Sequence, residues 1–83
     1  MDVGAKVKEI LLEILDVQEG DIVPSATFID DLGATSIELV EIFTAFENTF
    51  NVHIDPQGGG KVKTVQDAID LVQGALAQKG AAS

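Results

Sequence analysis

Apolar side chains near the start of the chain recur at helical spacing. They are Val3, Val7, Ile10, Leu11 and Ile14. At about 100° per residue these positions share one stripe, whereas Lys6, Glu9 and Glu13 point elsewhere. The pattern predicts an amphipathic helix over residues of about 3–16.

A second helix is predicted from residue 35 onward. Thr35-Ser36-Ile37-Glu38 matches a capping box, in which a hydroxyl and a later carboxylate satisfy the first free amides of a helix. Ser36 would therefore lie in the first turn. The apolar positions that follow form one core-facing stripe, made of Leu39, Ile42, Phe43, Phe46 and Phe50. So bulky a stripe indicates the central helix of the fold.

The helical periodicity stops between these two helices, over residues 16–34. Gly20, Pro24 and Gly33 interrupt this segment, which predicts a loop. Because it is longer than most connections, we expect it to be anchored in the core, or functional, or both. The anchors would be its large apolar side chains, Ile22, Val23, Phe28, Ile29 and Leu32.

The remainder of the chain predicts one more long helix. Residues 51–63 contain Pro56 and a triple glycine at 58–60, so at most a short turn is expected there. Thr64 then caps a last helix, with Asp67 at its third position. Gly80 is predicted to end this helix, and residues 79–83 to form a flexible tail. Its core stripe would be Val65, Ala68, Ile69, Val72, Ala75 and Leu76.

Length and pattern together define the fold class. The 83 residues suffice for one domain, 1–83, and show no internal repeat. We predict a small all-α bundle of three main helices and at most a short fourth, with a long loop between the first two helices. Little of so small a core can enclose an active site.

The charge balance narrows the range of partners. A formal net charge of −9 would repel nucleic acid and anionic lipid, so a basic protein surface is the expected partner. The chain has no cysteine, so any thiol chemistry has to come from a cofactor. No secretory leader and no apolar run of the roughly 20 residues needed to span a bilayer is present. We therefore expect a cytoplasmic monomer.

The segment Asp30-Asp31-Leu32-Gly33-Ala34-Thr35-Ser36-Ile37 resembles the phosphopantetheine attachment motif of acyl carrier proteins, D-x-L-G-x-D-S-L. Residues 45–50 and 64–69 resemble the family's second and last helices, so the resemblance spans essentially the whole chain. One departure from the motif is Thr35, which stands where the family usually has aspartate. Threonine also caps helices, whereas the missing carboxylate affects which transferase or partner enzyme recognises this surface.

The resemblance implies a carrier rather than an enzyme, with no catalytic residues of its own. A phosphopantetheinyl transferase would move 4'-phosphopantetheine from coenzyme A to Ser36, and the thiol of this arm would hold acyl groups as thioesters. Acyltransferases, ketosynthases and other acyl-using enzymes of fatty-acid, polyketide or related synthesis would be the partners. A serine in a first turn suits this role, because the free amides and positive end of the helix stabilise a phosphate.

The face of the second helix opposite its core stripe is a candidate docking surface. Ile37 and Val40 lie there with no core to enter. Acidic neighbours around such apolar anchors would steer a basic partner, although an ordinary solvated helix face can look the same. The candidate partner-binding residues are Ile37, Glu38, Val40, Glu41, Thr44 and Glu47.

Three alternatives stand beside the acyl carrier. An aminoacyl or peptidyl carrier shares the fold, but its motif more often has two glycines before the serine, unlike Gly33-Ala34-Thr35-Ser36. An unmodified acidic adaptor could bind a basic partner through the second helix. A serine hydrolase is disfavoured, because no Gly-x-Ser-x-Gly surrounds Ser36 and the single histidine, His53, is distant in sequence. No metal site is expected, since residues 16–21 lack the glycine and glutamate of a calcium loop.

Overall fold

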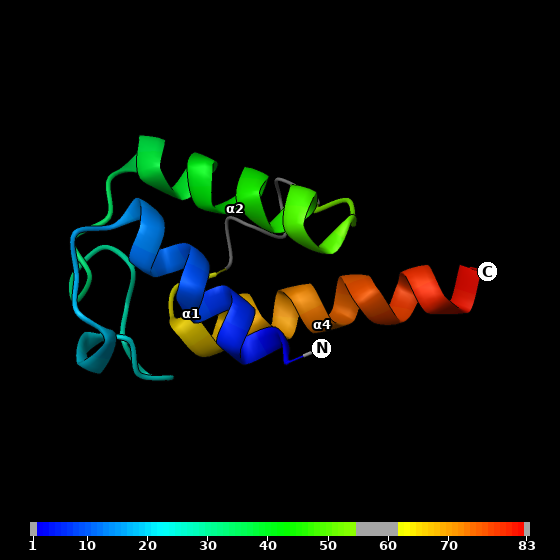
Figure 1. Ribbon diagram of the computed structural model, residues 1–83, viewed down its shortest axis with the longest axis horizontal. Coiled ribbons are helices and arrows are strands. Elements are labelled where there is room, and N and C mark those ends of the chain that lie inside the picture. The colour runs from blue at the N-terminus through cyan, green and yellow to red at the C-terminus, as the bar shows by residue number, and fades with distance from the viewer. Residues whose placement is uncertain (1, 55–61, 83) are drawn as a thin grey trace.

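In the residues that the structure describes, three α-helices pack against one another. The computed structural model describes residues 2–54 and 62–82, with side chains described up to residue 79. The helices are α1 (Val3–Ile14), α2 (Ser36–Phe50) and α4 (Val65–Ala82), and each contacts the other two. In Figure 1, α2 runs along one side of α1 and α4, with the long loop at one end of the molecule and the C-terminal half of α4 extending at the other.

The predicted all-α class is confirmed. Within residues 2–54 and 62–82, the only β feature is an isolated antiparallel bridge between Thr27 and Thr64. The long loop contains one short 3-10 turn, Glu19–Asp21. The short turn predicted around the triple glycine at 58–60 falls outside the residues that the structure describes.

The core combines the helical stripes that the sequence predicts, apart from Ala75, with buried residues that lie outside the helices. Burying each of these large side chains contributes roughly 1.5–3 kcal/mol, so together they supply most of the driving force for folding. In α2, Phe46 packs edge-on against both Phe43 and Phe50, with ring centroids 6.0 and 6.4 Å apart. The buried helical residues are Val7, Ile10 and Leu11 from α1, Ile42, Phe46 and Phe50 from α2, and Val65, Ala68 and Val72 from α4.

The first helix ends earlier than predicted, at Ile14 rather than at residue 16. Leu15 takes an extended backbone conformation, although its N–H still donates to the carbonyl oxygen of Leu11 at 2.9 Å. The turn out of the helix places the Leu15 side chain in the core, where it is buried. The helix therefore ends at the residue before Leu15, and the extended backbone of Leu15 allows its side chain to be buried.

The long loop is anchored in the core, as predicted, but by fewer residues. Ile22, Phe28 and Leu32 are buried, whereas Val23 and Ile29 are 45% and 60% exposed, so the prediction is wrong for these two. Phe28 and Ile29 are neighbours in sequence, and of the two only Phe28 faces the core. The N–H of Phe28 donates to the carbonyl oxygen of Lys63 at 3.0 Å, which holds Phe28 on the inside.

The last helix begins as predicted and ends later. Thr64 caps it, and Asp67 returns a carboxylate to the cap. The prediction that Gly80 ends the helix is wrong, because α4 runs to Ala82. A glycine ends a helix when it takes the left-handed conformation, and the alanines that follow Gly80 are the strongest helix formers. The flexibility expected of residues 79–83 stays a prediction.

Candidate functional site

The start of α2 is built as the capping box that the sequence predicts. The Glu38 N–H donates to Thr35 Oγ1 at 3.2 Å, and Glu38 Oε1 accepts from the Thr35 N–H at 2.9 Å. Gly33, just before the cap, has a φ of 70°, a left-handed conformation that glycine adopts without steric cost. Helix α2 therefore begins at Ser36: Gly33 allows the left-handed backbone conformation before it, and Thr35 caps its first turn.

The approach to this helix start is fixed by the side chain of Asp31. Asp31 Oδ2 accepts from the N–H and the hydroxyl of Thr27, at 2.8 and 3.1 Å, and the Asp31 N–H donates back to Thr27 Oγ1 at 3.1 Å. The Ala34 N–H donates to the carbonyl oxygen of Phe28 at 2.8 Å. Asp31 thus closes a turn, and the turn delivers the chain to the cap at a defined position.

Ser36 is exposed at the first position of α2. Among the residues that the structure describes, nothing hydrogen-bonds to its hydroxyl, and the backbone N–H groups of Ser36 and Ile37 find no acceptor. A helix start with unused N–H groups carries a partial positive charge and binds phosphate oxygens readily. The residues present therefore fit a phosphodiester at Ser36.

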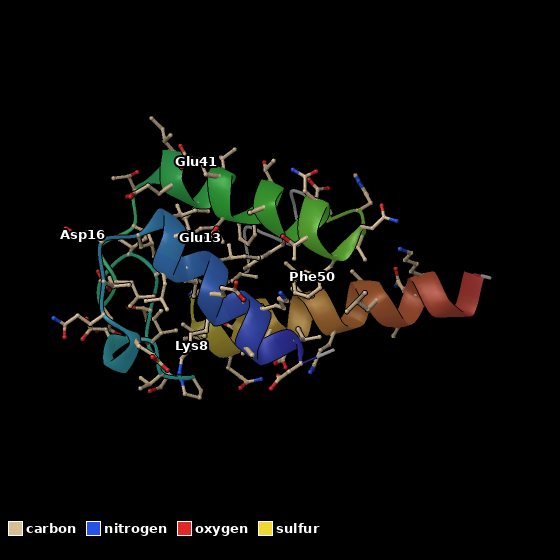
Figure 2. All side chains as sticks on the ribbon, viewed as in Figure 1. Lys8, Glu13, Asp16, Glu41 and Phe50 are labelled. Atoms are coloured by element: carbon tan, nitrogen blue, oxygen red, sulfur yellow. The ribbon has the colours of Figure 1, made fainter. Side chains whose placement is uncertain are left out.

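The predicted docking face of α2 is exposed. Ile37 and Val40 are 73% and 65% exposed, and Glu41 and Thr44 are also exposed. Figure 2 shows the side chain of Glu41 on the outer side of α2, and that of Phe50 on the side toward the other helices. Exposed apolar side chains therefore lie beside an exposed carboxylate in the first turns after Ser36.

The two other predicted acidic residues are engaged within the chain. Glu38 belongs to the capping box of α2. Glu47 is half-buried near the C-terminal end of the helix, where its Oε2 accepts from the N–H of Ile54 at 3.0 Å and lies 3.5 Å from Nδ1 of His53. The structure thus separates Glu38 and Glu47 from Glu41, which pairs with no described residue.

An open groove lies beside the start of α2. It has a volume of about 550 Å³ and is lined by Thr27, Phe28, Ile29, Asp30, Leu39, Val62 and Lys63. Leu39 connects it to the attachment region, because Leu39 lies one turn after Ser36 on α2. Sequence reasoning placed Ile29 in the core and did not select Asp30 or Lys63. No local signal in the sequence distinguishes Ile29 from Phe28 as the exposed member of the pair.

The described residues offer neither a metal-binding cluster nor a helix suited to spanning a membrane. In the described parts of the chain, no group of His, Asp or Glu side chains is arranged to hold a metal ion. None of the described helices combines the length and the apolar character needed to cross a membrane. His53 follows the C-terminal end of α2, whereas Ser36 opens the helix, so the two residues lie at opposite ends of it.

In the described residues, packed helices present an exposed serine at the capped start of α2, which is the geometry that a carrier domain needs. The family model described as "Phosphopantetheine attachment site" matches residues 5–58. The chain therefore belongs to the phosphopantetheine attachment family, in which 4'-phosphopantetheine is attached covalently.

Solved structures place the chain among the acyl carrier proteins of this family. It is similar to hexanoyl acyl carrier protein from the actinorhodin polyketide synthase of Streptomyces coelicolor, at 29% identity and a TM-score of 0.77, covering 89% of this chain and 90% of that one. It is also similar to acyl carrier protein from Enterococcus faecalis, at 27% identity and a TM-score of 0.76, covering 89% and 94%. Family and fold together identify an acyl carrier protein, as the sequence motif predicts.

Proposed function

We propose that Ser36 is the attachment residue for 4'-phosphopantetheine in this acyl carrier protein. The observation that supports the assignment is the exposed Ser36 hydroxyl at a capped helix start whose first N–H groups have no described partner. The bound arm ends in a thiol, which carries acyl groups as thioesters. The role of the chain is carriage, and the chemistry on the cargo belongs to its partners.

Attachment requires only a hydroxyl from this chain. The Ser36 Oγ attacks the phosphorus that bears the pantetheine unit of coenzyme A, so that an Oγ–P bond forms. The P–O bond to adenosine 3',5'-bisphosphate breaks, and a base of the transferase takes the serine proton. The unused N–H groups of Ser36 and Ile37 would then be available to oxygens of the phosphodiester that remains on the protein.

The partners in this proposal are enzymes with basic surfaces. They are a phosphopantetheinyl transferase and then acyltransferases, ketosynthases and related acyl-using enzymes. Ile37 and Val40 would supply apolar contacts, and Glu41 would supply the charge that steers a basic surface toward the serine. Thr44 extends the same exposed face, whereas Glu38 and Glu47 act by shaping the helix ends.

Intact-mass measurement tests the assignment directly. The protein is incubated with coenzyme A, magnesium and a transferase of broad specificity, and one phosphopantetheine is expected to be added. Ser25→Ala, which changes an exposed serine of the long loop, serves as the matched control and is expected to be modified fully. The proposal is wrong if Ser36→Ala still accepts the group, or if the unaltered protein accepts none.

A further inference from the structure

Five large apolar side chains are exposed in the part of the chain that the structure describes. Three of them, Ile29, Ile37 and Val40, belong to the groove or to the first turns around Ser36, and the other two are Leu12 and Val23. Single exposed apolar residues are ordinary in proteins, whereas a group of them around one position marks an interaction surface. Ile29 is the unexpected member, because it lies on the long loop and not on α2.

The residues on both sides of Ile29 are fixed by hydrogen bonds, and Ile29 itself is exposed. Its neighbour Phe28 is 1% exposed and is hydrogen-bonded on both sides, through its N–H to Lys63 and through its carbonyl oxygen to Ala34. On the other side, Asp31 is locked to Thr27 by side-chain and backbone hydrogen bonds. Ile29 is therefore presented at 60% exposure by a fixed turn, and binding can use it at little cost in conformational entropy.

This turn adjoins the attachment position. The bond from the Ala34 N–H to the Phe28 carbonyl oxygen ties the turn to the residue that precedes the cap of α2. Ile29 also shares the groove wall with Leu39, one helical turn after Ser36. Exposed apolar side chains are thus present both on the loop turn that leads to the start of α2, at Ile29, and in the first turns of the helix, at Ile37 and Val40.

Exposed carboxylates lie next to these apolar side chains, and one exposed lysine, Lys63, also lines the groove. Asp30 lies next to Ile29 and Glu41 next to Val40, and neither carboxylate pairs with a described residue. Apolar anchors with unpaired carboxylates beside them fit a partner whose own apolar recess is surrounded by basic side chains. The enzyme that modifies Ser36 acts on the side chain of this residue itself, so it is the partner that residues next to the serine fit best.

From this juxtaposition we propose that Ile29 is an anchor for the phosphopantetheinyl transferase, and that the docking surface spans the long loop as well as α2. The inference rests on the proposed attachment at Ser36. The surface consists of Ile29 and Asp30 on the loop and of Ile37, Val40 and Glu41 on the helix. It shifts the docking surface toward the serine and away from the C-terminal half of α2.

A matched pair of neutral substitutions tests the role of Ile29. Ile29→Ser and Val23→Ser both remove an exposed aliphatic side chain from the long loop. Val23 lies next to Pro24, whose carbonyl oxygen binds the start of α4 instead of α2. In assays of transfer from coenzyme A, Ile29→Ser is expected to lower kcat/KM about tenfold, mainly through KM, as loss of an interface anchor does. Val23→Ser is expected to stay within about twofold, as a change outside the interface does.

Two further measurements separate the outcomes. Prolonged incubation with excess transferase should load both variants completely, because Ser36 is present in each. If the wild-type protein itself is never loaded, the assignment of Ser36 is wrong, and the inference about Ile29 falls with it. Ile29→Leu should restore the rate, and melting temperatures should agree across the set. Equal kcat/KM for Ile29→Ser and Val23→Ser, with full loading of each, would show that Ile29 is not an anchor. Ile29 would then only line the groove.

Discussion

Helices α2 and α4 both begin with a threonine cap and an acidic residue three positions later. At α2, Thr35 and Glu38 exchange two hydrogen bonds. At α4, Thr64 Oγ1 accepts from the Asp67 N–H at 3.2 Å, and Asp67 Oδ2 accepts from the Thr64 N–H at 3.2 Å. The local capping chemistry is therefore the same at the two helix starts.

The two starts differ in what meets the next backbone N–H groups. At α4, Val65 donates to the carbonyl oxygen of Ala26 and Gln66 to that of Pro24, both at 3.0 Å, so the long loop uses these donors. Val65 itself is buried. At α2, Ser36 and Ile37 are exposed, and their N–H groups have no acceptor among the described residues.

The comparison shows that a capping box specifies where a helix begins but not what its first turn does. The same long loop passes both helix starts and forms hydrogen bonds with the first turn of α4 only. In Figure 1 this loop lies at the end of the molecule where α2 begins. A structural helix start and a candidate attachment site thus result from one motif, and the tertiary partners of the first N–H groups account for the difference.

The largest expected effect concerns a serine moved to the other helix. In the double variant Ser36→Ala with Val65→Ser, the start of α4 becomes Thr-Ser-Gln-Asp, which mimics the start of α2. We expect no loading at residue 65, because the long loop covers that turn and uses its N–H donors. Intact mass after incubation with coenzyme A and transferase gives the result. Loading of the double variant would mean that the capping motif alone suffices, and circular dichroism checks that its helices persist.

Substitution at residue 65 should lower the free energy of unfolding, whereas substitution at residue 36 should leave it nearly unchanged. Val65→Ser removes methyl groups from a buried site and places a hydroxyl there, so we expect a loss of about 2–4 kcal/mol in the free energy of unfolding. Ser36→Val changes an exposed first-turn residue and should stay within about 0.5 kcal/mol of the original. Urea unfolding measures both. Similar losses would show that Ser36 also has a packing role.

Much of this comparison was accessible from the sequence. Helical periodicity and the threonine caps predict α2 and the beginning of α4, because both signals are local and are carried by residues a few positions apart. The resemblance of residues 30–37 to the attachment motif indicates Ser36 as the attachment residue. The exposure of Ile37 and Val40 also follows from the helical wheel.

The rest depends on contacts between residues that are distant in sequence. Whether Phe28 or Ile29 faces the core is determined by the bond from Phe28 to Lys63, which no local pattern reveals. Glu47 was grouped with the docking residues because it shares their helix face, yet it binds the backbone of Ile54 after the helix has ended. Long-range hydrogen bonds therefore decide which exposed residues are available to a partner.

Removal of each cap should affect stability equally and function unequally. Thr35→Ala and Thr64→Ala each delete one capping hydrogen bond, which should cost about 0.5–2 kcal/mol. Only Thr35→Ala is expected to slow loading, because fraying of the first turn of α2 displaces Ser36. Urea unfolding and transfer kinetics on both variants test this. Thr35→Ser keeps the cap and should restore the rate, and an equal rate for Thr35→Ala and wild type would show that the cap does not position the serine.

The smallest expected effect is the pH dependence contributed by Asp67. Hydrogen bonds from the backbone N–H groups of Lys63 and Thr64 lower the pKa of Asp67 below its ordinary value. The folded protein therefore favours the charged carboxylate, which stabilises it above the ordinary aspartate pKa of about 4. This contribution should be lost as pH falls from about 4 through the lower pKa of the folded state.

Asp67→Asn isolates this contribution. Asparagine can accept the same hydrogen bonds through its side-chain oxygen but does not titrate, so the change in stability should be small near neutral pH. Wild type should exceed the variant there, and the two should converge below about pH 4. Urea unfolding at constant ionic strength from pH 7 to pH 3 measures the difference. A difference that does not vary with pH would show that the charge of Asp67 contributes nothing to the stability of the start of α4.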